Sequence, residues 1–110
     1  MLVSSKNLEV SVIPYAIITT DKPDHLRVRN DNRPEHGDYL VANQYRLLAS
    51  GALIEDDGSG GKGGLIIVDT DDRGEAEEFI NGDRFTKAGL FQSVTIPRWR
   101  KAFLNFETLI

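Results

Sequence analysis

The chain contains no cysteine, and this absence excludes several kinds of chemistry. Disulfide bonds, thiolate zinc sites and cysteine nucleophiles all need a thiol. Histidine is scarce as well, with two among 110 residues, so a histidine-rich metal centre is not expected. We therefore predict that the protein holds no metal ion.

Positive charge is outnumbered by negative charge. The chain has 13 lysines and arginines against 17 aspartates and glutamates, which gives a formal net charge of −4. Proteins that follow the phosphates of nucleic acids normally carry a basic excess. We therefore predict no nucleic-acid partner.

Long apolar runs are missing too. The longest one near the start, residues 10–18, is interrupted by Ser11 and Pro14. It falls far short of the ~20 residues that span a membrane, and it has neither the basic flank nor the cleavage site of a signal peptide. We expect no membrane contact and a cytoplasmic location.

What is present is an ordinary globular composition, 40% hydrophobic and 27% charged, with room for one domain. We divide the chain into an N-terminal lead-in (residues 1–13), a domain (14–103) and a C-terminal tail (104–110). The last ten residues include Phe103, Phe106 and Leu109 and are too apolar to be left freely in water. One interpretation makes this apolar end the basis of a larger assembly.

The first half of the chain predicts a strand and then a helix. Residues 15–20 are β-branched and aromatic, which favours a strand. Residues 26–30 could form a helical turn. The first convincing helix is expected to begin near Pro34, because proline suits the first helical position. It is expected to end at Ser50–Gly51, with Leu47 and Leu48 on its apolar face.

The second half predicts two strands, a helix, a short turn and a final strand. Residues 51–54 and 65–68 read as a hairpin. Asp72 starts the second helix, and Asn81–Gly82 ends it, because glycine is the usual left-handed residue after a helix. Asp83 caps a short turn that Gly89 closes, and the last strand covers residues 92–96.

The predicted order is β-α-β-β-α-β, so we expect an α+β fold of the ferredoxin-like kind, with a four-stranded antiparallel sheet. Both helices then cover one face of the sheet. The strands at residues 15–20 and 65–68 are apolar on both sides, so the second face needs a cover. We predict that a second copy of the chain supplies it and that the protein is a homodimer with its sheets face to face.

A glycine-rich segment, residues 58–63 (GSGGKG), formally fits the dinucleotide-binding pattern. That motif must follow a strand and open a helix, so that the pyrophosphate meets the helix N-terminus. Here the segment leads into a strand. We therefore interpret it as a hairpin loop, although its backbone amides and Lys62 could help to hold an anion.

His36 and Asp83 are the first candidates for chemistry. A general base is often a histidine whose second nitrogen is held by a carboxylate, which fixes the tautomer and steadies the developing charge. Spacing alone does not show that residues 36 and 83 meet. The plainer interpretation is a satisfied histidine and a helix-capping aspartate.

Arg29 and Arg33 belong to an arginine cluster ahead of the predicted helix. Arginine binds carboxylates and phosphates well, so both are candidate substrate contacts, and we add Tyr15 to them. The alternative is pairing with neighbouring acidic residues, which is the commoner outcome for solvated arginines.

Several of these segments together resemble a known family. They are residues 15–21, the start of the helix at Arg33-Pro34-Glu35-His36, and residues 83–91 (DRFTKAGLF) with the strand that follows. Residues 14–103 resemble the YciI-like (YCII-related domain) family. The sequence departs from the family pattern at Arg84, where proline is usual, and at Gly37, where leucine is usual.

The resemblance implies a dimeric α+β barrel of ferredoxin-like subunits in which His36 and Asp83 meet in a cleft as a His–Asp dyad. It also implies a small enzyme without cofactors, similar to isomerases, lyases and dehalogenases that act on small oxygenated ring compounds. We expect a small, anionic ligand. The alternative is a module of the same family that binds a small ligand or a protein partner without catalysis.

Overall fold

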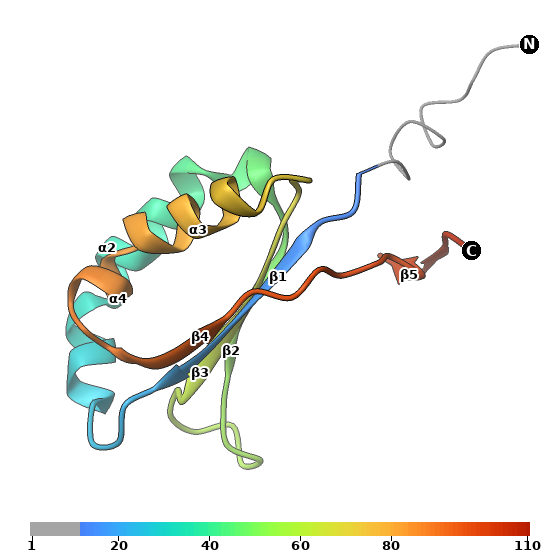
Figure 1. Ribbon diagram of the computed structural model, residues 1–110. Coiled ribbons are helices and arrows are strands. Elements are labelled where there is room, and N and C mark those ends of the chain that lie inside the picture. Colours follow the sequence, from blue (N-terminus) through green and yellow to red (C-terminus); the bar gives the residue numbers. More distant parts are fainter. Residues whose placement is uncertain (1–11) are drawn as a thin grey trace, which may run out of the picture.

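The computed structural model describes residues 12–110, so nearly all of the predicted lead-in lies outside the described residues. One four-stranded sheet forms the body, and helices cover one of its faces (Figure 1). The strands are β1 (Tyr15–Asp21), β2 (Leu47–Leu53), β3 (Gly63–Val68) and β4 (Phe91–Thr95). Their order across the sheet is β2-β3-β1-β4, and every neighbouring pair is antiparallel.

Three helices lie on the covered face: α2 (Leu26–Ala42), α3 (Arg73–Gly82) and the short α4 (Arg84–Lys87). A 3-10 turn, Gln44–Arg46, joins α2 to β2. This arrangement confirms the predicted α+β, ferredoxin-like order. Within residues 12–110, none of the helices has the length and apolar character of a membrane-spanning segment.

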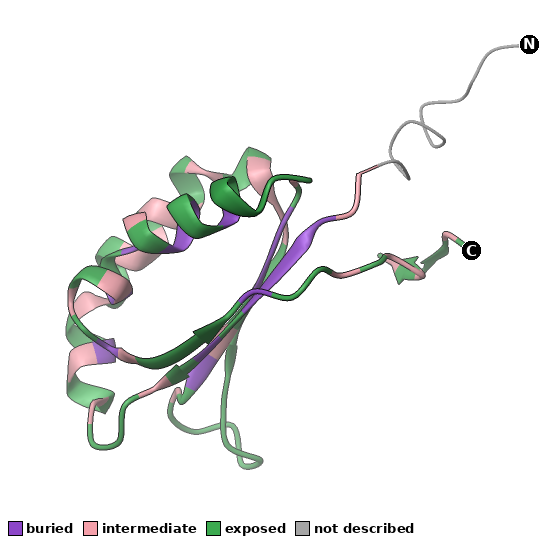
Figure 2. Ribbon diagram, viewed as in Figure 1, coloured by how far each residue is buried: buried purple, intermediate pink, exposed green. Residues whose placement is uncertain are grey.

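The core lies between the helices and the sheet (Figure 2). Alternate residues of the central strand, Tyr15 and Ile17, pack against Phe79 and Ile80 of α3. The intervening residues point to the other face, which no helix covers. We call this face, with Ala16, Ile18 and Thr20 of β1 and Leu65 and Ile67 of β3, the outer face.

The prediction for the first helix is wrong at both ends. It begins at Leu26, eight residues before Pro34, and it ends at Ala42. Pro34 therefore sits inside the helix, where it has no N–H to donate to the carbonyl one turn earlier. The first turns are held instead by Arg29, which bonds to Asp21 and to the carbonyl of Gly63. Asp21 is eight positions from Arg29, and Gly63 is 34 positions away on another strand, so the local sequence does not show the whole contact.

Leu47 and Leu48 belong to β2 and not to the helix. The strand runs through Ser50–Gly51, where the helix was expected to stop, and it pairs with β3 from Leu47 to Leu53. Apolar residues spaced three or four apart fit a helix, but a short apolar run also fits a strand. Pairing with the buried β3 decides between the two.

Gly82 ends α3 as predicted, but the reason is different. Left-handed backbone is recorded for other residues and not for Gly82. A Cβ at Gly82 would lie 2.5 Å from the hydroxyl oxygen of Tyr39, so glycine is needed for close approach. Asp83 caps α4 and Gly89 follows this short helix, both as predicted. The positive φ of 73° at Gly89 was not predicted.

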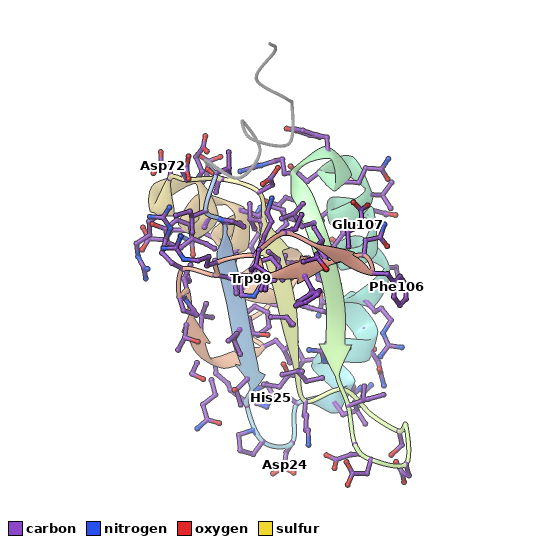
Figure 3. The ribbon with its side chains drawn as sticks, turned by 90° about the vertical axis from the view of Figure 1, so that its right-hand side faces the viewer. Asp24, His25, Asp72, Trp99, Phe106 and Glu107 are labelled. Carbon is purple, nitrogen blue, oxygen red and sulfur yellow. The ribbon has the colours of Figure 1, made fainter. Side chains whose placement is uncertain are left out.

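After β4 the chain leaves the body as an arm, which we define as residues 100–110 (Figure 1). It contains a small hairpin of β5 (Phe103–Leu104) and β6 (Glu107–Thr108). The division predicted between residues 103 and 104 falls inside this hairpin. Figure 3 looks onto the outer face, and the arm crosses in front of the strands.

Candidate functional site

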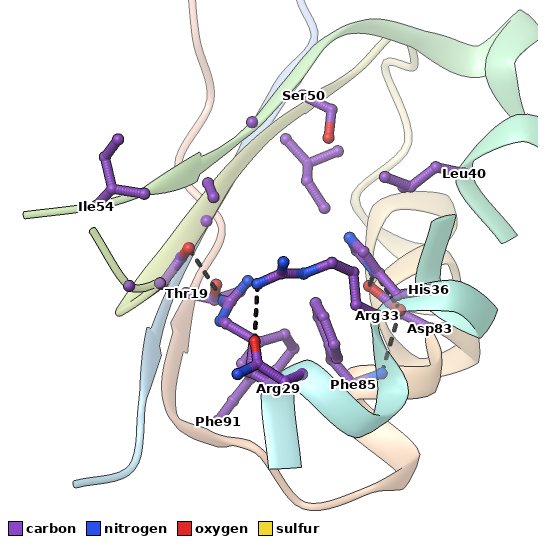
Figure 4. A pocket seen from close by; sticks show the side chains of 18 of the residues that line it. Thr19, Arg29, Arg33, His36, Leu40, Ser50, Ile54, Asp83, Phe85 and Phe91 are labelled. Atoms are coloured by element: carbon purple, nitrogen blue, oxygen red, sulfur yellow. Dashed lines mark hydrogen bonds and ion pairs between the residues drawn. The ribbon is translucent and has the colours of Figure 1, made fainter. Parts of the chain in front are cut away.

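A cavity of about 630 Å³ opens between α2, the strands β2 and β3, and the loop that joins them (Figure 4). Its apolar wall includes Leu26, Leu40, Ile54, Ile66 and Phe91. The glycine-rich loop contributes backbone at Gly58, Gly60 and Gly61. The volume is in the range that holds a small organic ligand. The loop joins two strands of a hairpin, as predicted, and opens no helix.

His36 and Asp83 both line this cavity and are bonded to each other. The Nδ1 atom of His36 lies 2.8 Å from Oδ1 and 2.9 Å from Oδ2 of Asp83. The structure therefore brings together two residues that are 47 positions apart. With Nδ1 engaged, Nε2 is the imidazole nitrogen left for the cavity.

Asp83 is completely buried, and the local backbone explains its position. It ends α3 and caps α4, where Oδ1 accepts a hydrogen bond from the Phe85 backbone N–H at 3.2 Å. A capping carboxylate accepts from backbone donors that have no helical partner. The second interaction of the same carboxylate is with His36, so one aspartate serves as a helix cap and as the partner of the imidazole.

The imidazole of His36 is held by its ring as well as by its nitrogen. It stacks on the ring of Phe85, with the ring centroids 4.0 Å apart and 17° between the planes. The side chain keeps 18% of its surface exposed, while that of Asp83 has none. The histidine is thus fixed in orientation and open on the side of the cavity.

One face of α2 carries a row of polar side chains that all bond to the corner between α3 and α4. They are Asn32, His36 and Tyr39. Asn32 accepts from Arg84 at 2.8 Å, and Tyr39 donates to the backbone carbonyl of Phe79 at 2.8 Å. The four- and three-residue steps place these side chains on one face of a helix. This row locks α2 to the segment that carries Asp83.

Arg29 lines the cavity, but its guanidinium is already bonded. Nε donates to Asp21 Oδ2 at 2.6 Å, Nη2 donates to Asp21 Oδ1 at 3.0 Å, and Nη2 also donates to the carbonyl of Gly63 at 3.1 Å. Its side chain also passes Gly61, where a Cβ would lie 2.5 Å from Arg29 Cδ. These contacts identify Arg29 as a buried structural residue that connects α2 to the sheet.

Arg33 lies beside Arg29 in the cavity and differs from it in its partners (Figure 4). Its Nη2 donates to Asn30 Oδ1 at 3.0 Å. Within residues 12–110, no ion pair is recorded for it. Arg33 is therefore a cation that an anionic ligand could reach.

Tyr15 is not brought to the cavity. It is 8% exposed and belongs to the core cluster with Ile17 and Phe79. The guanidiniums of Arg73 and Arg98 lie over its ring, with their central carbons 6.0 Å and 4.9 Å from the ring centroid.

Sequence reasoning missed most of the wall of the cavity. Thr19, Ser50 and Phe91 line it from three different strands, and Phe85 supports the histidine. The segment 83–91 was noticed for its family pattern, so Phe85 and Phe91 could have been found there. Ser50 was assigned to the end of a helix, and its place in β2 removed it from consideration.

No metal site is formed in the part of the chain that the structure describes. Groups of three or more histidine, aspartate or glutamate side chains close enough to hold a metal ion are not found among residues 12–110. Every buried side-chain nitrogen and oxygen within the same range has a hydrogen-bond partner.

The fold and the paired histidine and aspartate define a class of small α+β proteins, and comparison with known proteins identifies the family. Residues 13–100 match the YCII-related domain, and the chain belongs to this family. It is 28% identical over 96 residues to protein YciI of Escherichia coli O6:H1 and, equally, to protein YciI of Shigella flexneri. Each match covers 81% of this chain and 98% of the relative.

A solved structure with the same fold comes from Burkholderia phenoliruptrix AC1100. It is a 5-chloro-2-hydroxyhydroquinone dehydrochlorinase in complex with 2,5-dihydroxybenzoquinone. It is 30% identical to this chain, with a TM-score of 0.73, and the match covers 79% of this chain and 93% of that one. The family and the fold class predicted from the sequence are confirmed.

Proposed function

We propose that the protein is a small enzyme that performs general acid–base chemistry on a small oxygenated compound without a cofactor. His36 is the catalytic base, Asp83 orients it, and Arg33 holds an anionic group of the substrate. The observation that carries this proposal is the bonded pair of His36 and Asp83 in the wall of a ligand-sized cavity.

The proposed roles follow from the geometry of the pair. The Asp83 carboxylate is a hydrogen-bond acceptor, so it favours the tautomer with the proton on Nδ1 of His36. Nε2 then has a free lone pair directed to the cavity. When Nε2 takes a proton from the substrate, the imidazole becomes positive next to the buried carboxylate, which stabilises that charge. A positioned base of this kind typically contributes a factor of about 10²–10⁴ to the rate.

The proton removed by His36 would come from a carbon next to a carbonyl or from a hydroxyl on a ring. Both reactions place negative charge on a substrate oxygen. Arg33 is the cavity cation that can meet this charge or a permanent anionic group, since Arg29 is neutralised by Asp21. A guanidinium fixed near a developing oxyanion lowers the barrier through electrostatic stabilisation.

The related dehydrochlorinase supports the choice of reaction class. Its name describes the loss of hydrogen chloride from a hydroxylated ring, and it was solved with a dihydroxybenzoquinone. Such an elimination needs a base to accept the proton while chloride departs with the electron pair of its bond to carbon. Lyase, isomerase and dehalogenase reactions that start with removal of a proton are therefore the expected range.

Location in the cytoplasm stays a prediction from the sequence.

The proposed working form is a homodimer joined through the outer face. On this face Ala16 and Ile67 are already buried within the chain, at 6% and 8% exposed. Ile18 and Leu65, side by side on β1 and β3, are 38% and 37% exposed and form its open apolar part. An apolar sheet face left open on a small domain is typical of a docking surface. A second copy with the same face buries both at once.

The test compares the two histidines of the chain. The protein is incubated with 2,5-dihydroxybenzoquinone, chlorinated hydroxyhydroquinones, ring lactones and keto acids, and product formation and chloride release are followed. His36→Ala is expected to lose activity by a factor of about 10² or more. His25→Ala, which changes a histidine whose Nδ1 contacts the Pro23 carbonyl, is the control and is expected to keep it. Equal turnover by both variants would refute the proposed base, and saturable binding without any turnover would favour the non-catalytic module.

A further inference from the structure

We propose that the arm clasps a second copy of the chain and that its exposed aromatic side chains pack against the partner's sheet. This inference rests on the proposed homodimer. The inference goes beyond the homodimer because it assigns a specific segment, residues 100–110, to holding the two copies together.

The arm displays large apolar side chains to solvent. Phe103 is 60% exposed, Phe106 is fully exposed, and Ile110 is 85% exposed. Three such side chains lie within eight residues on a segment that extends from the body (Figure 1). Exposed apolar residues scattered singly are normal, whereas a cluster marks an interaction site.

The backbone of the arm is shaped to present one of these side chains. Asn105 and Phe106 join β5 to β6 in a two-residue turn, and both have positive φ, 54° and 67°. Asparagine tolerates this left-handed conformation, but phenylalanine rarely adopts it, and glycine is usual at the second position of such turns. The strained residue carries a bulky ring at the tip of the hairpin, which points to a role for that ring outside the body.

The strands of the hairpin are joined by backbone pairing within the arm itself. Phe103 pairs with Thr108, Leu104 pairs with Glu107, and the Leu109 N–H donates to the Ala102 carbonyl at 2.7 Å. At its base the chain is tied to the start of β1, where the Trp99 N–H donates to the Pro14 carbonyl at 2.9 Å. The arm therefore leaves the body in a defined direction.

That direction identifies the partner. The arm projects on the side of the outer face, away from the helices, in both views of the molecule (Figures 1 and 3). The same side exposes Ile18, Leu65 and Leu53, each between 37% and 40% exposed. A two-fold dimer needs one surface that carries both halves of a complementary contact. An apolar arm and an apolar sheet face on one side of the molecule meet that requirement, because a two-fold axis brings each arm onto the other copy's sheet.

The experiment uses the full chain and measures the dimer dissociation constant by sedimentation velocity. Phe103→Asp combined with Phe106→Asp is expected to raise this constant about tenfold or more, since buried aromatic anchors dominate interfaces. Val41→Asp is the matched control. Val41 is 68% exposed on α2, on the opposite side of the sheet, so its substitution is expected to leave the constant unchanged. Circular dichroism checks that each variant is folded.

A second measurement locates the arm. The chain has no cysteine, so Glu107→Cys gives a single attachment point for a spin label that spares both phenylalanines. Spin-labelled Glu107→Cys protein at natural isotope abundance is mixed with ¹⁵N-labelled protein of unchanged sequence. We expect the amide signals of β1, β2 and β3 in the ¹⁵N copy to broaden more than those of α2 and α3.

The outcomes separate the arm from the rest of the account. A dimer that survives the double substitution, without broadening between copies, overturns the arm proposal and leaves the dimer and the catalytic proposal standing. A monomer at tens of micromolar overturns the arm and the homodimer together, while the comparison of the two histidines still tests the chemistry. Binding of the unchanged chain to lipid vesicles through the arm, with no dimer present, also overturns the proposal.

Discussion

The hydroxyl of Tyr39 donates a hydrogen bond to the backbone carbonyl of Phe79 at 2.8 Å. Tyr39 lies on α2, three residues after the catalytic candidate His36. Phe79 lies in the last turn of α3, whose final carbonyls have no partner within the helix. Tyr39 therefore closes the end of α3 immediately before Asp83. Gly82 leaves room for the hydroxyl.

We predict that Tyr39→Phe lowers the free energy of unfolding by about 1 kcal/mol, because the Phe79 carbonyl loses its donor. Urea denaturation monitored by circular dichroism measures the change. Tyr45→Phe is the matched control, since Tyr45 is 81% exposed, and we expect a change within about 0.5 kcal/mol. Equal effects of the two substitutions would show that the tie between α2 and α3 adds nothing.

The same tyrosine makes stability depend on pH in the alkaline range. Burial raises the pKa of the Tyr39 phenol above its ordinary value of 10.0. The folded protein then holds the phenolic proton more tightly than the unfolded chain does. This contribution to stability is fully present below pH 10 and is lost as the pH rises through the folded-state pKa. Denaturant midpoints measured between about pH 8 and pH 11 should fall more steeply for the unchanged protein than for Tyr39→Phe; parallel curves would contradict this.

Arg29 is predicted to support the fold more than it supports ligand binding. Its side chain and that of Asp21 are 6% and 7% exposed. Removing one partner of a buried pair leaves an uncompensated charge, and the typical loss is about 3–5 kcal/mol. Arg29→Met should therefore destabilise the protein strongly. Arg27→Met, two residues earlier, breaks an exposed pair with Asp31 and should cost well under 1 kcal/mol. A small loss of stability in Arg29→Met would contradict this structural role, and Arg29 would again be a candidate ligand contact.

The helix that carries His36 contains two residues that oppose helix formation. Pro34 and Gly37 both lie in the interior of α2. A Cβ at Gly37 would meet no atom within 4 Å, so Gly37→Ala should raise the free energy of unfolding by about 0.5–1 kcal/mol. Thermal denaturation checks this. A loss of stability would mean that glycine at this position serves the fold in a way that its open surroundings do not show.

The order of elements was predictable from the sequence because it depends on local features. Asp83 caps α4 and Gly89 closes the turn, as short-range rules predict. A helical turn at residues 26–30 was predicted, but its continuation through Pro34 into one helix was not. Arg29, in that turn, is held by Asp21 and by the Gly63 carbonyl.

The pairing at the candidate site was only partly predictable. His36 and Asp83 were singled out by residue type and by family resemblance, and their contact depends on α2 lying against the α3–α4 corner. The place of Ser50 in the cavity was hidden because its segment was assigned to a helix. The separation of Tyr15 from the cavity follows from its position at the far end of β1, against Arg98.

The ¹⁵N spectrum of the His36 imidazole tests the central claim most directly. His25→Ala protein leaves one histidine, so its two ring nitrogens are assigned without ambiguity. At about pH 9, where imidazoles are generally neutral, we predict a proton on Nδ1, bonded to Asp83, and an unprotonated Nε2 whose signal shifts when 2,5-dihydroxybenzoquinone is added. Asp83→Asn should abolish the preference for this tautomer. A proton on Nε2 in the unchanged pair, or an Nε2 signal indifferent to every compound that binds, would contradict the assignment of His36 as the base.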